Sequence, residues 1–182
     1  MMVWRRAHVE LIACVLTAGV AIGAVGAANS EGGWVPKLTG RVNDTANVLS
    51  SVDRDRISEI LRSYERETHH QIVVLTIATL GDEKIEAFSL RTCNAWGIGQ
   101  KAVDDGICVT LAMKERRVRV ELGKGMERFI SDADAKAIID TEMTPAFAKG
   151  DYFGGLERGL KRLMEDGRRF VVHAEAGPTP SN

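Results

Sequence analysis

Acidic residues in the loops are the side chains of this sequence best suited to chemistry. Their carboxylate oxygens are the ligands that hard cations such as Ca²⁺ prefer. If the loops meet at one edge of the fold, the sequence predicts a calcium site, with Mg²⁺ the less suitable ion. Acids in loops can also stay apart in solvent, and the spacing leaves both alternatives open. The candidate metal ligands are Asp44, Asp104, Asp105, Glu127 and Asp132.

Familiar catalytic signatures are missing from the sequence. There is no nucleophile elbow, no phosphate-binding P-loop and no His-Glu-x-x-His zinc motif. Asp132-Ala133-Asp134 resembles the signature of aspartate-nucleophile phosphatases, but the segment before it is too polar for the strand that this chemistry requires. We therefore interpret both aspartates as residues that stabilise a helix N-terminus.

The pair His69-His70 suggests a metal at first sight. Neighbouring residues do not face each other on a helix, so the two imidazoles are poorly placed to hold one ion. The sequence favours solvent-exposed histidines at the end of a helix.

Length and composition indicate one ordinary globular domain. The chain has 182 residues, 45% of them hydrophobic, with 24 Lys and Arg against 25 Asp and Glu. Its near-zero net charge provides no basic surface for nucleic acid, so we expect no nucleic-acid partner.

The first 28 residues resemble a secretory signal peptide. Arg5 and Arg6 precede an apolar stretch from Leu11 to Ala28 that ends in small residues. We expect cleavage after Ala28 and a periplasmic or secreted protein, with an uncleaved N-terminal membrane anchor as the alternative. The predicted organisation is a signal peptide at 1–28, a flexible lead-in at 29–37, a single domain at 38–172 and a disordered tail at 173–182.

Export would leave Cys93 and Cys108 in an oxidising compartment, where a disulfide is possible. Cys93 lies in a helical pattern and Cys108 in a strand pattern, and each is typical of a small buried hydrophobic residue. We predict that they are not bridged.

Hydrophobic periodicity predicts an α/β fold with a small mixed sheet and helices on both faces. Two buried strands joined by a crossover helix form a parallel pair, and a third strand follows the second in a hairpin. A later helix begins at Ser131 and is expected to end at Pro145. The other predicted elements are helices at 50–68 and 85–96, strands at 71–77, 107–113 and 117–122, and a last helix from Asp151.

Ordered sequence blocks identify the chain as a member of the TPM domain family. The resemblance covers about residues 35–165. The blocks that carry it are Val35–Asp44, Gln71–Ile77, Trp96–Lys101, Asp105-Gly106, Arg116–Gly123, Gly125-Met126-Glu127, Asp132, Pro145-Ala146-Phe147 and Gly150-Asp151-Tyr152.

The resemblance implies a Rossmann-like α/β/α sandwich in an exported protein. Members of the family include a chloroplast-lumen protein described as an acid phosphatase, and some bind Ca²⁺ at acidic loops. Asp44, Asp105, Glu127 and Asp132 match the acidic blocks of the family, and Asp104 is adjacent. Lys124 departs from the pattern, because relatives often have an aromatic residue there.

Two functions follow as expectations. The first is an interaction, assembly or maintenance factor with a protein partner at the cell envelope, its acidic loops ordered by Ca²⁺. The second is a metal-assisted acid phosphatase of low specificity, with Lys124 or Arg116 neutralising the phosphoryl charge. No nucleophile or general base stands out, so enzyme activity stays open and the sequence slightly favours the first function.

Overall fold

The computed structural model describes residues 33–175. The predicted signal peptide and most of the predicted tail lie outside these residues. Within them, no helix is both long enough and apolar enough to cross a membrane.

A four-stranded mixed sheet forms the centre of the described fold, in the order β1-β2-β3-β4. The first three strands are parallel, and β4 pairs antiparallel with β3. The strands are β1 Val42–Asp44, β2 Ile72–Ile77, β3 Ile107–Ala112 and β4 Arg117–Leu122. This confirms the predicted α/β class, the parallel pair and the hairpin, and adds the short strand β1.

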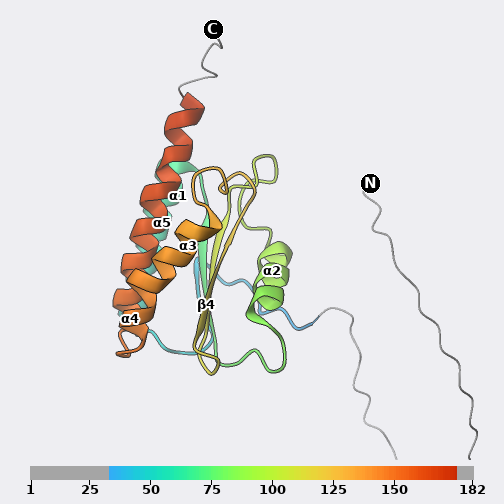
Figure 1. The fold of residues 1–182 in the computed structure, drawn as a ribbon, viewed down its shortest axis with the longest axis vertical. Helices are drawn as coiled ribbons and strands as arrows, with labels where there is room; N and C mark the ends of the chain where they lie inside the picture. The colour runs from blue at the N-terminus through green and yellow to red at the C-terminus, as the bar shows by residue number, and fades with distance from the viewer. Residues whose placement is uncertain (1–32, 176–182) are drawn as a thin grey trace, which may run out of the picture. The chain divides into compact units, whose positions relative to one another are not determined.

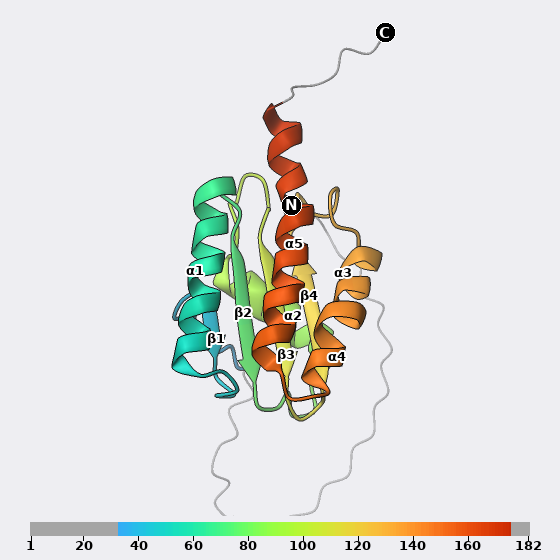
Figure 2. The same ribbon diagram turned by 90° about the vertical axis from the view of Figure 1, so that its left-hand side faces the viewer.

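Helices cover both faces of the sheet, as Figures 1 and 2 show. One face carries α1 (Ser51–Thr68), α3 (Asp132–Ile138), α4 (Thr144–Phe147) and α5 (Tyr152–Glu175), and the opposite face carries α2 (Ile85–Trp96). The α1 stripe of Ile57, Leu61 and Tyr64 is buried against the sheet. The larger core therefore lies under α1 and α5, and a smaller one around Leu75, Ile85 and Phe88 lies under α2.

The expected helix end at Pro145 is wrong. The chain continues from α3 through a π-helical turn, Ile139–Met143, into α4, where Pro145 occupies the first turn. In the π-helical turn the Thr144 N–H donates to the Ile139 carbonyl, five residues earlier. The widened turn lets the chain pass a proline that has no N–H to donate, so the helical path bends and continues.

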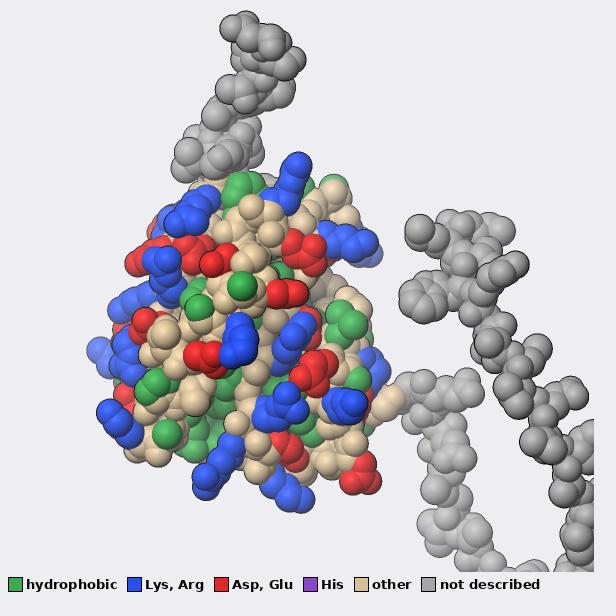
Figure 3. Space-filling model, viewed as in Figure 1, with side chains coloured by type: hydrophobic (Ala, Val, Ile, Leu, Met, Phe, Trp, Pro, Cys, Tyr) green, Lys and Arg blue, Asp and Glu red, His purple; other side chains and the backbone are tan. Residues whose placement is uncertain are grey.

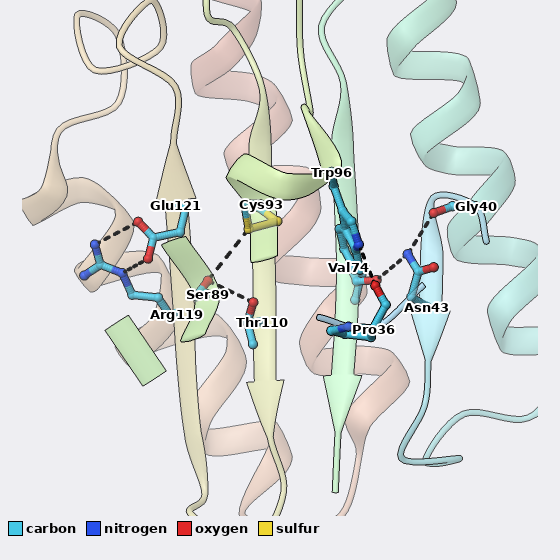
Figure 4. The surroundings of a disulfide bond; sticks show 11 residues. Pro36, Gly40, Asn43, Val74, Ser89, Cys93, Trp96, Thr110, Arg119 and Glu121 are labelled. Atoms are coloured by element: carbon cyan, nitrogen blue, oxygen red, sulfur yellow. Dashed lines mark hydrogen bonds and ion pairs between the residues drawn. A yellow bond between two sulfur atoms is a disulfide. The ribbon is translucent and has the colours of Figure 1, made fainter. Parts of the chain in front are cut away.

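The prediction that Cys93 and Cys108 are not bridged is also wrong. They form a disulfide with their Cα atoms 6.3 Å apart, and it joins α2 to β3 (Figure 4). Beside it, the Ser89 and Thr110 hydroxyls lie 2.9 Å apart. Each cysteine does occupy the expected element, but the pattern of one element cannot reveal its distance from another.

The described part of the lead-in lies against α2. The Arg91 guanidinium donates to the carbonyl oxygens of Gly33 and Trp34, at 2.6 and 2.9 Å. The Trp96 indole N–H donates to the Pro36 carbonyl oxygen at 2.8 Å (Figure 4). These hydrogen bonds hold residues 33–36 against α2, the helix on the less covered face of the sheet.

Candidate functional site

The candidate acids lie at two opposite edges of the sheet. We call the edge with the carboxyl ends of β1, β2 and β3 the carboxyl edge, and the edge where β2 and β3 begin the amino edge. Asp44 is the last residue of β1, at the carboxyl edge, and Asp105 precedes β3, at the amino edge. Each acid therefore forms hydrogen bonds with a different set of loops.

Asp44 holds the turn after β1. Its Oδ1 accepts from the Val48 N–H at 3.1 Å and its Oδ2 from the Leu49 N–H at 3.0 Å. The Thr76 hydroxyl donates to it from β2, and the Arg54 guanidinium approaches to 3.4 Å from α1. Burial alone would raise the pKa of the Asp44 carboxyl, but these hydrogen bonds outweigh burial and hold the pKa below its ordinary value.

Asp105 is completely buried and holds the amino edge together. Its Oδ1 accepts from the Gln100 N–H at 2.7 Å, and its Oδ2 lies 2.8 Å from the His70 Nδ1. The Gln100 side-chain amide also approaches Oδ2, at 3.4 Å. One carboxylate thereby links the start of β2 to the loop before β3.

Strand register separates Asp44 from Asp105. Asp44 pairs with Thr76, which in turn pairs with Leu111 of β3. Leu111 is six residues beyond Asp105, so at about 3.3 Å per residue the two levels are about 20 Å apart along the strands. The structure does not bring these two carboxylates together.

Backbone contacts shape the rest of the amino edge. The Asp104 carbonyl oxygen accepts from the Gly125 N–H at 2.9 Å, and its Oδ2 accepts from the Lys124 N–H at 3.1 Å. A Cβ atom at Gly123 would overlap the Asp104 carbonyl, so only glycine allows this approach. Gly99 and Gly106 meet equally closely, and Gly99 has a φ of +92°. The glycines therefore let three loop segments pack backbone against backbone.

Asp104, Glu127 and Asp132 are exposed. Asp104 lies directly on the loop that carries Lys124, and Glu127 follows in the same segment. Asp132 begins α3, where its neighbour Asp134 forms a capping box with Ser131. That cap agrees with the interpretation of these aspartates as residues of a helix N-terminus.

Comparison with known proteins identifies the family. A family model described as the TPM domain matches residues 42–166. The chain belongs to the TPM domain family. A search of the curated proteins finds no match.

Solved structures share this TPM-domain fold. The N-terminal domain of a P. gingivalis protein is 30% identical, covers 69% of this chain and 80% of that domain, and gives a TM-score of 0.64. BA42 from Bizionia argentinensis is 15% identical, over 67% of this chain and 83% of its own, with a TM-score of 0.59. The N-terminal domain of cg2496 from Corynebacterium glutamicum is 16% identical, over 82% and 93%, with a TM-score of 0.52. The last two support the fold alone.

The five predicted ligands do not fit a single calcium site in this TPM domain. Asp44 is at the wrong edge, and both oxygens of Asp105 already accept hydrogen bonds. In the part of the chain that the structure describes, no three His, Cys, Asp or Glu side chains gather closely enough to hold a metal ion. Calcium stays a prediction only for the exposed acids of the amino edge, Asp104 and Glu127, which would need water and main-chain carbonyls to complete a coordination shell.

His70 is the functional residue that sequence reasoning missed in this TPM domain. His69 is exposed as expected and closes α1 with a φ of +63°, but His70 is buried against Asp105. The available signal was position, since His70 lies two residues before a strand whose every residue is buried. The prediction of two exposed histidines is therefore wrong for His70.

Proposed function

We propose that this TPM-domain protein is exported and acts in the cell envelope as a protein-binding factor for assembly or maintenance. The proposal rests on the hydrogen bonds of the amino edge, where the Asp105 carboxylate contacts both the His70 imidazole and the Gln100 N–H. A loop edge held in one arrangement presents its exposed charges at fixed positions. Fixed charges favour recognition of a partner by electrostatic complementarity.

Two observations support export. Residues 1–28 have the pattern of a secretory signal peptide. Independently, Cys93 and Cys108 form a disulfide, and structural disulfides persist in oxidising compartments and are rare in the cytosol. Mass spectrometry of the protein recovered from the envelope tests both, because export predicts loss of residues 1–28 and two fewer thiol hydrogens. A full-length chain with free Cys93 and Cys108 would contradict the proposal.

The exposed surface of the amino edge combines both signs of charge. Asp104 and Glu127 are exposed, and so are Lys124 and Arg128. The partner that such a surface suits is a protein with a mixed-charge surface of its own. A charge reversal at Glu127 should therefore weaken binding, chiefly through the association rate and with strong dependence on salt.

The two cations suggested for the phosphatase alternative lie at opposite edges of the sheet. Lys124 belongs to the amino edge, whereas Arg116 lies in the turn between β3 and β4, at the carboxyl edge. The two cations therefore cannot neutralise the same phosphoryl group. A phosphatase site would therefore have to use one of these two cations alone.

One experiment separates these functions. The thermal midpoint of the purified protein is measured with EDTA, Ca²⁺ and Mg²⁺, and hydrolysis of a chromogenic phosphate ester is followed in each buffer. The binding factor predicts no hydrolysis, and a rise with Ca²⁺ that disappears in Asp104→Asn with Glu127→Gln would place calcium at the amino edge. Metal-dependent hydrolysis that Asp105→Asn abolishes would overturn the proposal in favour of an enzyme.

A further inference from the structure

A cavity of about 380 Å³ opens at the carboxyl edge, away from the amino edge just described. It lies between the end of β3, the β3–β4 turn and the α4–α5 turn. Figure 3 shows hydrophobic side chains gathered at the lower left, over the region of α4 and the lower ends of the strands. Its volume is within the range of small-molecule sites. Six of the residues that line it are Leu111, Met113, Arg116, Val118, Phe147 and Tyr152.

The position of this cavity is the one that ligands favour in open α/β sheets. In such folds ligands bind outside the carboxyl ends of the parallel strands. Leu111 and Ala112 are the last residues of the parallel strand β3, and both line the cavity. The cavity therefore lies on the side of the sheet where such folds bind their ligands.

Two unusual backbone features border the same cavity. Arg116 has a φ of +52°, a left-handed conformation that few residues other than glycine adopt. The π-helical turn Ile139–Met143 leads directly into Thr144, which lines the cavity. π-helical turns are frequent at functional sites, whereas a left-handed residue also occurs regularly in short hairpin loops such as the one between β3 and β4. Here they come from two separate segments and meet at one place.

Arg116 is the one charged residue among those that line the cavity. Its guanidinium makes no hydrogen bond or ion pair with any residue that the structure describes. The neighbouring Glu115 forms no ion pair with it; that carboxylate accepts from the Thr79 hydroxyl at 2.8 Å and the Leu80 N–H at 3.1 Å instead. The cavity therefore combines an apolar wall with a single uncompensated cation.

We propose that this cavity binds a small organic carboxylate with an apolar body. The carboxylate pairs with the Arg116 guanidinium, whose planar fork matches its two oxygens. The apolar body packs against Phe147 and Tyr152, whose rings lie 5.7 Å apart. A phosphate monoester is less suitable, since its second negative charge would have no cation among the residues that line the cavity. The site is independent of export and of a protein partner.

The test is a titration of the isotope-labelled protein, followed by NMR of its amides. The probes are 4-phenylbutyrate, its uncharged amide 4-phenylbutyramide, and phenyl phosphate. We expect 4-phenylbutyrate to bind best and to shift the amide signals of Met113, Arg116 and Gly150. Arg116→Gln should weaken its binding by about tenfold, because one charged hydrogen-bonded pair is lost. Arg62→Gln removes an exposed arginine of α1 that does not line the cavity, and serves as the matched control.

A second variant fills the cavity itself. Ala148 lines it, is exposed and has an ordinary helical conformation, so Ala148→Trp should fold normally while it blocks the apolar body. An unchanged dispersion of the amide signals confirms the fold of each variant. Binding of 4-phenylbutyrate that survives Ala148→Trp, equal binding of the amide, or tighter binding of phenyl phosphate would each overturn the proposal.

Discussion

The imidazole of His70 and the carboxylate of Asp105 form a buried pair at the amino edge of the sheet. Nδ1 and Oδ2 lie 2.8 Å apart, and the two side chains are 3% and 0% exposed. Because Asp105 also accepts from the Gln100 backbone N–H, one carboxylate connects the segment before β2 to the loop before β3. The pair determines the arrangement of the loops, so its loss should affect stability as well as binding.

Replacement of Asp105 by alanine should destabilise the protein by about 3 kcal/mol, because it leaves a buried imidazole and a backbone N–H without their acceptor. Urea unfolding measures the loss. Glu127→Ala, at an exposed acid of the same edge, is the control and should change stability little. In a double-mutant cycle with His70→Ala, the two losses should be coupled by more than about 1 kcal/mol. Strictly additive losses would contradict the pair.

Asp44 should make stability depend on acid. Its pKa is held below the ordinary value of 3.8, so its hydrogen bonds stabilise the folded state above that pH. This contribution is lost as the pH falls through the lowered pKa. The unfolding free energy of the wild type should therefore drop more steeply below pH 4 than that of Asp44→Asn. Parallel curves for the two proteins would show that Asp44 contributes nothing.

Reduction of the disulfide should lower the unfolding free energy by about 3 kcal/mol, the value typical of a closed loop of about 15 residues. Thermal or urea unfolding with and without a reductant measures this. The double variant Cys93→Ser with Cys108→Ser should resemble the reduced protein and no longer respond to the reductant. Equal stability of the oxidised and reduced wild type is the result that would contradict this prediction.

Tyr64 should ionise only in strong alkali. Burial, which disfavours the charged phenolate, raises its pKa to about 12. Stability should therefore fall as the pH rises from 10 towards 12, where the unfolded chain loses the proton first. The absorbance of tyrosinate, followed against pH, should lose its high-pH step in Tyr64→Phe. A wild-type titration without that step would disprove the shift.

Sequence patterns predicted the main elements because each pattern is local. The buried run before Ala78 and the alternation of Arg117–Leu122 define their strands without reference to the rest of the chain. The carboxylates were different, since their positions depend on strand direction. With β1 only three residues long, its pattern was too short to recognise, and Asp44 was placed in a loop. Once β1 is parallel to β3, Asp44 and Asp105 must occupy opposite edges.

The remaining errors concern contacts between elements. Cys93 and Cys108 were each assigned to the correct kind of element, but their pairing depends on how α2 crosses β3. His70 was misplaced because the chain turns inward directly after the left-handed His69. The same holds for the proposed cavity. Arg116 lines it only because the β3–β4 turn lies next to the turn between α4 and α5, which no local pattern predicts.

The position of α2 also implies an order of events during folding. This helix lies over the smaller core, and part of its attachment is the covalent bond to β3 together with the contacts of Arg91 and Trp96 to the lead-in. The larger core under α1 and α5 needs no oxidation to form. In an exported chain, the sheet and its larger helical layer would therefore assemble first. The helix α2 would be secured last, once the two thiols have met an oxidant outside the cytoplasm.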